Sequence, residues 1–422
     1  MIVLCAHHLY TPQQEIQYPL LFIEDGLIAA VSSRAETEVP PAATVIDLNK
    51  DDLNKDDRTK EDLYKGDLNK DGLASVGLAN AAFAGSILAP GFFDIHLHGG
   101  AGLDVMRASP SDLPRLNKFL ATHGVTGYFP TTVAAPLDQT CAALARLADA
   151  IEAAANSTDD REIQARPLGI HLEGPFISHK RRGVHPTEFL LEPTLEIFDR
   201  LWQAARGHVR MMTIAPELPG ALEVIAEAAR RNVCVSLGHS DAQLEPARAA
   251  VRAGARHATH TFNAMRPLDH RDPGLLAEVL TDTNLTADII ADGIHVAPEV
   301  VKLFLHAKGV DRAVLITDAI SATGMPDGTY QLGPIQVEVK DGRCTADGKL
   351  AGSVLTMDAA VRNVTRFANW TLRDAVRAAT LNPARAAGLP LQGKIIPGAE
   401  ANLVVLSPDG RVRQTWVRGR PA

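Results

Sequence analysis

The stretch GFFDIHLHG, residues 91–99, decides the fold. It is a short, largely apolar run that ends in two histidines one residue apart, His96 and His98, and it is bounded by glycines. That pattern is typical of a buried β-strand. Side chains alternate along a strand, so both imidazoles can point to the same side and face one ion. The stretch therefore predicts a strand that carries metal ligands at its end.

Seven further runs of the same kind follow, separated by Ala-rich amphipathic segments that are typical of helices. The runs are 124–132, 166–174, 208–216, 232–240, 255–262, 285–293 and 312–319. Eight strands that alternate with helices predict an α/β protein with a (β/α)8 TIM-like barrel, which we place at residues 85–390 as the catalytic domain.

Both ends of the chain are rich in β-type residues and turn signals. Residues 1–48 and 391–422 are therefore expected to pair into one small β-sandwich domain, built from both chain termini. A hairpin is expected after the last barrel strand, within 330–353, because two Asp-Gly-type turns occur there.

Residues 49–84 differ from the rest in composition, and the word DLNKD occurs three times from residue 47 to residue 71. The stretch 47–72 holds nine acids and six bases. Residues 67–72 match the start of a calcium loop, but Leu78 stands where such a loop needs a bidentate Glu. We therefore interpret the repeat as part of a solvated, low-complexity loop. The family resemblance given below implies that 49–84 is an insertion between the small β domain and the barrel.

The composition excludes several classes of function. The 422 residues carry 42 Lys+Arg against 50 Asp+Glu, a formal charge of −8, which argues against a nucleic-acid or anionic-membrane partner. No apolar run is long enough to cross a bilayer, and the N-terminus does not resemble a secretory signal. Four separated cysteines without a CxxC pair favour a reduced, cytoplasmic enzyme.

Four more strand ends carry imidazole or carboxylate groups: Glu173, His239, His260 and Asp318. Because the carboxyl ends of barrel strands share one face, these groups and the first-strand histidines are expected to converge. Imidazole and carboxylate together suit Zn²⁺, Fe²⁺, Co²⁺ or Mn²⁺, and the lack of thiolates argues against a structural zinc.

Each of these residues alone has an ordinary structural explanation. A single strand-end histidine is usually a hydrogen-bonded core residue, Glu173 could be a buried ion-pair partner, and Asp318 could cap a helix. Their joint position at one barrel face favours the metal site. His171 and His257 lack such support and are expected to be structural.

Several motifs resemble a known family. PGFFDIHLHG (90–99) and GKIIPGAEANLVVL (393–406) are similar to the opening and closing signatures of the amidohydrolase superfamily. Five motifs in order resemble the N-acetylglucosamine-6-phosphate deacetylase family: HLEGPF (171–176), LGHS (237–240), THTFNAM (259–265), DGIH (292–295) and TDAI (317–320). The resemblance implies hydrolysis of the acetamide of N-acetylglucosamine 6-phosphate to glucosamine 6-phosphate and acetate.

The resemblance also implies roles for individual residues. Glu173, His239 and His260 would hold the main ion, and Asp318 would take a proton from the attacking water and pass it to the leaving amine. His185 would polarise the acetyl carbonyl. The residues implied in substrate binding are Asn263, Ala264, Arg271, His295, Leu355 and Met357.

In this family, the arginine that corresponds to Arg271 reaches across from a neighbouring subunit. Arg271 therefore implies a homodimer. One or two divalent ions per subunit are expected, with Zn²⁺ favoured, because His96 and His98 are both present and could form a second site with Glu173 and Asp318.

Three other functions stay open. A relative that acts on the galacto epimer could differ by one loop. Another amidohydrolase is less favoured, because Glu173 stands where those enzymes commonly use a carboxylated lysine or a cysteine. A sugar-phosphate-sensing scaffold without activity would be indicated by loss of Asp318 or a ligand, and none is lost.

Overall fold

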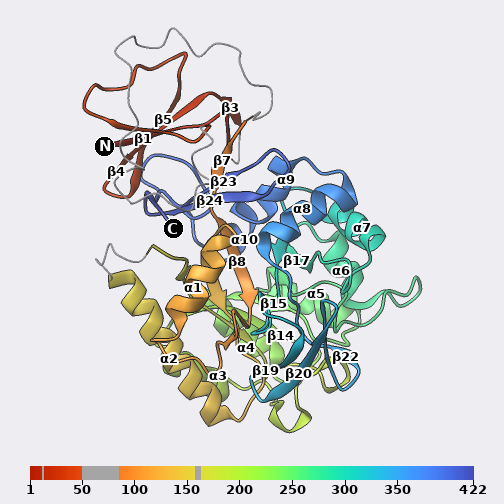
Figure 1. Ribbon diagram of the computed structural model, residues 1–422. Coiled ribbons are helices and arrows are strands. Elements are labelled where there is room, and N and C mark those ends of the chain that lie inside the picture. The colour runs from red at the N-terminus through yellow and green to blue at the C-terminus, as the bar shows by residue number, and fades with distance from the viewer. Residues whose placement is uncertain (12–13, 50–84, 157–162) are drawn as a thin grey trace.

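The computed structural model describes residues 1–11, 14–49, 85–156 and 163–422 (Figure 1). Except for Asn49, the predicted inserted loop lies outside the described residues, as does the calcium-like motif. Among the described residues, no helix combines the length and the apolar character needed to cross a membrane.

Eight short parallel strands form the centre of the larger body, and each lies within one of the eight predicted runs. They are β8 (Phe92–Leu97), β11 (Val125–Pro130), β13 (Ile170–Glu173), β14 (Val209–Ile214), β15 (Cys234–Leu237), β16 (His257–Ala258), β17 (Ala287–Ile290) and β18 (Ala313–Ile316). Parallel ladders pair β8 with β11 and β17 with β18. A third group of parallel strands has the order β13, β14, β15, β16.

Single bridges and backbone hydrogen bonds join these groups into a ring. Thr131 bridges to His171 between β11 and β13, and Leu97 bridges to Ala319 between the first strand and the last. The backbone N–H of Ala258 donates to the Thr286 carbonyl at 3.1 Å, which links β16 to the segment entering β17. The eight-stranded barrel is therefore confirmed.

One helix follows each barrel strand, and these helices surround the ring (Figure 1). They are α1 (Leu113–Thr122), α2 (Leu137–Asn156), α3 (Leu195–Ala204), α4 (Ala221–Arg230), α5 (Leu244–Ala253), α6 (Gly274–Thr281), α7 (Pro298–Lys308) and α8 (Met357–Ala368). The helices α9 (Leu372–Ala378) and α10 (Leu381–Ala386) follow them.

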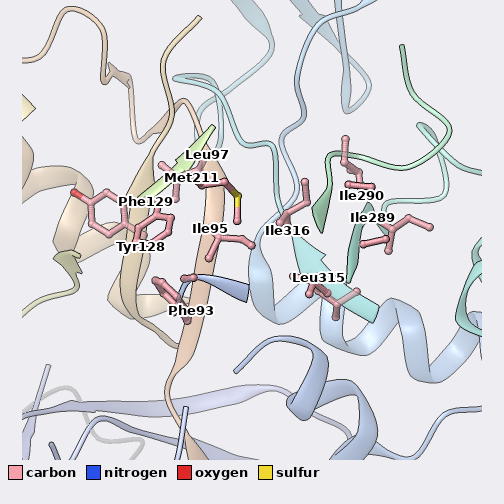
Figure 2. Packing of buried hydrophobic residues seen from close by; sticks show 14 of the residues in the cluster. Phe93, Ile95, Leu97, Tyr128, Phe129, Met211, Ile289, Ile290, Leu315 and Ile316 are labelled. Atoms are coloured by element: carbon pink, nitrogen blue, oxygen red, sulfur yellow. The ribbon is translucent and has the colours of Figure 1, made fainter. Parts of the chain in front are cut away.

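The apolar side chains of the strands form one buried cluster with residues of the helices, part of which is shown in Figure 2. Phe93 on β8 and Phe129 on β11 belong to it, and their rings meet edge-on with centroids 5.1 Å apart.

Polar side chains cross the inside of the barrel, which the sequence analysis did not predict. His171 lies with Nδ1 3.1 Å from the Ile95 carbonyl and Nε2 2.8 Å from Thr213 Oγ1. Thr213 in turn contacts Thr259 at 2.8 Å, and Thr259 contacts Ser236 at 2.5 Å. The contacts of His171 with Ile95 and of Thr213 with Thr259 each skip one strand of the ring, so they run through the interior, and His171 is structural as expected.

The small β domain consists of two sheets. A six-stranded sheet has the order β25-β24-β23-β7-β2-β3 and contains strands from both ends of the chain. Its strands are β25 (Arg420–Pro421), β24 (Val412–Val417), β23 (Leu403–Leu406), β7 (Ile87–Pro90), β2 (His8–Tyr10) and β3 (Glu15–Gln17). A four-stranded sheet has the order β5 (Leu27–Ser33), β4 (Pro19–Glu24), β1 (Ile2–Cys5) and β6 (Thr44–Asp47).

Leu4 and Leu9 of the N-terminal part pack in one cluster with Val405 and Trp416 of the C-terminal part. The sandwich built from both termini is therefore confirmed, while the boundaries of the three predicted regions stay predictions.

A four-stranded antiparallel sheet follows the last barrel strand, where the hairpin was expected. It consists of β19 (Gly328–Leu332), β20 (Ile335–Lys340), β21 (Arg343–Ala346) and β22 (Lys349–Leu350). In Figure 1 it lies at the end of the barrel away from the small β domain. This end also holds the candidate site, because residues of β19 and β22 line its cavity.

Candidate metal and active site

The six predicted ligands meet at the carboxyl ends of five barrel strands, and all six are buried. They form two groups, one of His96, His98 and Asp318 and the other of Glu173, His239 and His260. Within each group the ligand atoms lie within 4.8 Å of one another. The strand-end rule thus brings together residues that are more than 200 positions apart in the chain.

Glu173 stands between the two groups. Its Oε1 lies 3.1 Å from His239 Nε2 and 2.9 Å from His260 Nε2. Its Oε2 lies 3.2 Å from His98 Nε2 and 3.5 Å from His96 Nε2. Burial alone would raise the pKa of Glu173, but the charges and hydrogen bonds of these histidines outweigh it and hold the pKa well below its usual value. The carboxylate is therefore ionised and faces both groups.

Hydrogen bonds fix the tautomers of two ligand histidines. The Nδ1–H of His98 donates to the Thr131 carbonyl at 3.0 Å, and the Nδ1–H of His239 donates to the Arg181 carbonyl at 2.9 Å. When these rings are neutral, Nε2 of each carries a lone pair directed into the site, which is the arrangement of a metal-ligating imidazole.

This donor set fits a divalent cation. Imidazole nitrogens and ionised carboxylate oxygens converge, neither group contains a cysteine, and the ligands are buried. A cation bound close to Glu173 would stabilise this buried carboxylate, which several imidazoles surround.

Three site residues have left-handed backbone conformations. The φ angles are 47° at His239, 29° at His260 and 51° at Asp318. Such angles cost of order 1–3 kcal/mol for residues other than glycine, and they concentrate at functional sites.

Asp318 lies with Oδ1 3.1 Å from His98 Nε2. Burial would raise the pKa of Asp318, but the hydrogen bond from Nε2–H of the protonated His98 ring and the charge of His96 lower it to about 2. The ionised carboxylate can accept a proton from a water molecule beside it.

Asp94 supports this arrangement, and the sequence analysis missed it. Its Oδ2 accepts a 2.6 Å hydrogen bond from Thr317 Oγ1, and its Oδ1 accepts one of 3.2 Å from the backbone N–H of His96. It therefore ties the ligand strand β8 to the residue before Asp318. An acid inside a buried strand, two residues before the ligand His96, was the signal that could have identified it.

His185 lies in a loop between β13 and α3, with Nε2 3.7 Å from Glu173 Oε2. The backbone N–H of Ala134 donates to its Nδ1 at 3.1 Å, so the neutral ring carries its proton on Nε2, the atom nearer to Glu173. Burial and the nearby charge of His239 lower the pKa of His185 to about 3. His185 is therefore a neutral hydrogen-bond donor.

A cavity of about 230 Å³ opens beside these groups, and Asn263, Ala264 and His295 line it as predicted. The Nδ2 donor of Asn263 is buried and has no hydrogen-bond partner in the described chain. Nδ1 of His295 lies 2.7 Å from Asp292 Oδ2, which orients the ring. A larger cavity of about 780 Å³ is lined mainly by the small β domain and holds none of the six ligands.

Three predicted substrate residues do not line the cavity. Arg271 is exposed, whereas Leu355 and Met357 are buried. Leu350, Ala351 and Gly352, a few residues before Leu355, line the cavity instead. The roles of Arg271, Leu355 and Met357 stay predictions.

The fold and the site define a class: a barrel enzyme that holds a divalent metal between histidines and carboxylates at the carboxyl ends of its strands. Residues 87–422 match the model of the amidohydrolase family. The chain belongs to this family, which implies a divalent metal.

The chain is similar to several deacetylases. It is 40% identical over 338 residues to the N-acetylgalactosamine-6-phosphate deacetylase of Escherichia coli O157:H7, a match that covers 80% of this chain and 88% of the relative. It is 39% identical over 335 residues to the N-acetylglucosamine-6-phosphate deacetylase of Vibrio furnissii, covering 79% and 82%.

A solved structure is similar over the whole chain. It is a variant of the N-acetyl-D-glucosamine-6-phosphate deacetylase of Mycobacterium smegmatis in complex with N-acetyl-D-glucosamine 6-phosphate. The identity is 32%, the TM-score is 0.83, and the match covers 100% of this chain and 98% of the other. The resemblance to this deacetylase family is therefore confirmed.

Proposed function

We propose that the protein hydrolyses the acetamide of N-acetyl-D-glucosamine 6-phosphate to D-glucosamine 6-phosphate and acetate. The observation that carries the proposal is the convergence of ionised Asp318, the neutral donor His185 and the two ligand groups on one cavity. The deacetylase relatives support the choice of substrate.

The proposed roles follow from the geometry. A divalent cation held by Glu173, His239 and His260 would supply Lewis acidity and a lowered water pKa when bound. Asp318 takes a proton from the water that attacks the acetyl carbon. It then gives that proton to the amine nitrogen as the C–N bond breaks, because an unprotonated amine is a poor leaving group. The Nε2–H of His185 donates to the carbonyl oxygen, on which negative charge develops.

Zn²⁺ is the proposed metal, with Fe²⁺, Co²⁺ and Mn²⁺ as alternatives, and one or two ions are proposed per subunit. His96 and His98, with Glu173 and Asp318, supply the ligands for a second ion. Metal analysis of the wild type and of Glu173→Ala tests this: the variant, which loses a ligand facing both groups, should hold less metal. A metal-free wild type with full activity would contradict the proposal.

The galacto epimer is the second candidate substrate, because one relative acts on N-acetylgalactosamine 6-phosphate. Acetate release should be measured with both epimers and with unphosphorylated N-acetylglucosamine, for the wild type and for Asp318→Asn. The gluco 6-phosphate is expected to give the highest kcat/KM, and Asp318→Asn to abolish turnover. Activity that survives in Asp318→Asn would reject Asp318 as the proton carrier, and a folded wild type that binds substrate without turnover would indicate a sensing scaffold.

We also propose a homodimer in which exposed Arg271 reaches the neighbouring site. Mixing subunits tests this. Arg271→Met and Asp318→Asn subunits should each be inactive or weak alone. A mixed dimer, however, contains one site with an intact Asp318 and an intact partner arginine, so activity should return. No recovery after verified subunit exchange would contradict the arrangement. A cytoplasmic location stays a prediction.

A further inference from the structure

One cationic side chain stands at the mouth of the site cavity, and no family motif pointed to it. Lys349 on β22 is exposed, and it is the one lysine or arginine among the described residues that line this cavity. The strand lies about 30 residues after the last barrel strand and reaches the cavity because the sheet β19–β22 folds back over it.

Of the neighbouring cations, Arg266 and Arg181 are paired with carboxylates, and Arg182 donates to the His185 carbonyl at 2.6 Å. Arg266 pairs with Asp272 and lies 3.7 Å from Asp241. Arg181 pairs with the same Asp241 at 2.8 Å. The guanidiniums of Arg266 and Arg181 therefore carry little uncompensated charge toward the cavity.

Lys349 differs in this respect. No described carboxylate lies within ion-pair distance of its ammonium, whose one hydrogen bond in the described chain is a long contact of 3.4 Å to the Gly183 carbonyl. A lysine stem is flexible and its ammonium has three donors, so the group can turn toward an anion in the cavity. The cavity thus has a cation available at its mouth and, in Asn263, a buried donor without a partner.

We infer that Lys349 is a specificity-determining residue that binds the phosphate of the substrate from within the same subunit. The inference rests on the proposed function, since it requires a phosphorylated substrate. A phosphate monoester is a dianion of high charge density, and a protein with a net charge of −8 attracts it only through such local cations. Charge-assisted hydrogen bonds to phosphate are stronger than neutral ones.

Steady-state kinetics of Lys349→Met test the inference. With N-acetylglucosamine 6-phosphate we expect kcat/KM to fall about tenfold, mostly through KM, which corresponds to about 1.4 kcal/mol of binding. With unphosphorylated N-acetylglucosamine no change is expected. Lys349→Arg should retain most of the activity, and the dependence of KM on salt should be weaker in Lys349→Met than in the wild type. Lys340→Met is the matched control, because Lys340 is exposed on the same sheet and does not line the cavity.

Two results would overturn the inference. One is an unchanged KM for the phosphorylated substrate. The other is an equal loss with both substrates, which would mean that Lys349 only holds the loop at Gly183. A binding measurement tests this inference separately from the proposed function. In a metal-loaded Asp318→Asn background, Lys349→Met should raise the Kd for N-acetylglucosamine 6-phosphate about tenfold. This result is expected even if the wild type shows no turnover.

Discussion

The chemistry of His185 is fixed by one backbone hydrogen bond. Because Ala134 N–H donates to Nδ1 and the pKa of the ring lies at about 3, His185 presents an Nε2–H donor across the whole working range of pH. We expect His185→Ala to lower kcat by about 10²–10³, the loss typical of an oxyanion donor, with little change in KM. His185→Gln keeps an N–H donor and should be less impaired.

The pH profile distinguishes this role from acid–base catalysis. A neutral donor does not titrate between pH 5 and pH 9. The plot of kcat against pH for His185→Gln should therefore rise and fall at the same pH values as that of the wild type, with a lower maximum. Loss of one limb in the variant would show that His185 itself gains or loses a proton during turnover.

Thr317 is expected to position Asp318 through Asp94. Thr317→Val removes the 2.6 Å hydrogen bond and leaves a buried carboxylate oxygen of Asp94 without its partner, which costs about 1–3 kcal/mol. Both the melting temperature and kcat should fall. Thr365→Val on α8, whose hydroxyl bonds only within its own helix, is the control and should change neither. An unchanged kcat in Thr317→Val would mean that Asp94 does not position Asp318.

The site could be predicted only in part from the sequence. His96 and His98 follow from strand alternation, and Glu173, His239 and Asp318 follow from their places at strand ends. Lys349 could not be found this way, because its position depends on how a separate antiparallel sheet folds over the barrel. The tautomer of His185 could not be predicted either, since its partner Ala134 belongs to another loop.

The contact between α6 and α7 depends on a buried lysine. Lys308, in the last turn of α7, is only 1% exposed, and its Nζ donates to the Val279 carbonyl at 2.6 Å and to the Asp282 carbonyl at 3.0 Å. These carbonyls lie at the end of α6 and lack helical partners. Burial lowers the pKa of Lys308 from 10.5 to about 8.

A pH-dependent stability follows from this pKa. Between pH 8 and pH 10.5 the unfolded chain binds more protons at this site than the folded chain, so the wild type gains stability as the pH rises. We expect Lys308→Met to melt slightly below the wild type at pH 7.5 and further below it at pH 10, in calorimetry. For Lys302→Met, at an exposed position of the same helix, the difference in melting temperature from the wild type should be the same at both pH values. The prediction would be contradicted if the melting temperature of Lys308→Met differed from that of the wild type by the same amount at pH 7.5 and at pH 10.

At the level of elements, the order of strands and helices was predictable, because apolar runs and amphipathic segments alternate along the chain. The polar interior was not, because the hydrogen bonds of His171, Thr213 and Thr259 join strands that are distant in sequence. Each of these residues looks unremarkable alone, and only closure of the ring brings their side chains together.

At the scale of the whole molecule, the repeat-rich segment is inserted between β6 and β7, two strands that both belong to the small β domain. The described chain stops at Asn49 and resumes at Gly85. On either side of that gap, Ser86 Oγ donates to the Leu48 carbonyl at 2.5 Å, and the Ser86 carbonyl accepts from the backbone N–H of His7 at 3.1 Å. The two ends of the segment are therefore held together without it.

Deletion of residues 50–77 should for this reason leave the fold and activity intact. The remaining residues can join two points that already touch, and shortening a long loop lowers its closure entropy cost only slightly. The deleted residues 50–77 hold eight acids and six bases, which is −2 of the net charge of −8, and they include neither the ligands nor Lys349, so kcat/KM for the sugar phosphate should change less than twofold. A Gly-Ser replacement of equal length is the control for loop length. Loss of turnover in soluble, folded deletion protein, with activity kept in the Gly-Ser variant, would show that the length of the segment matters to the site.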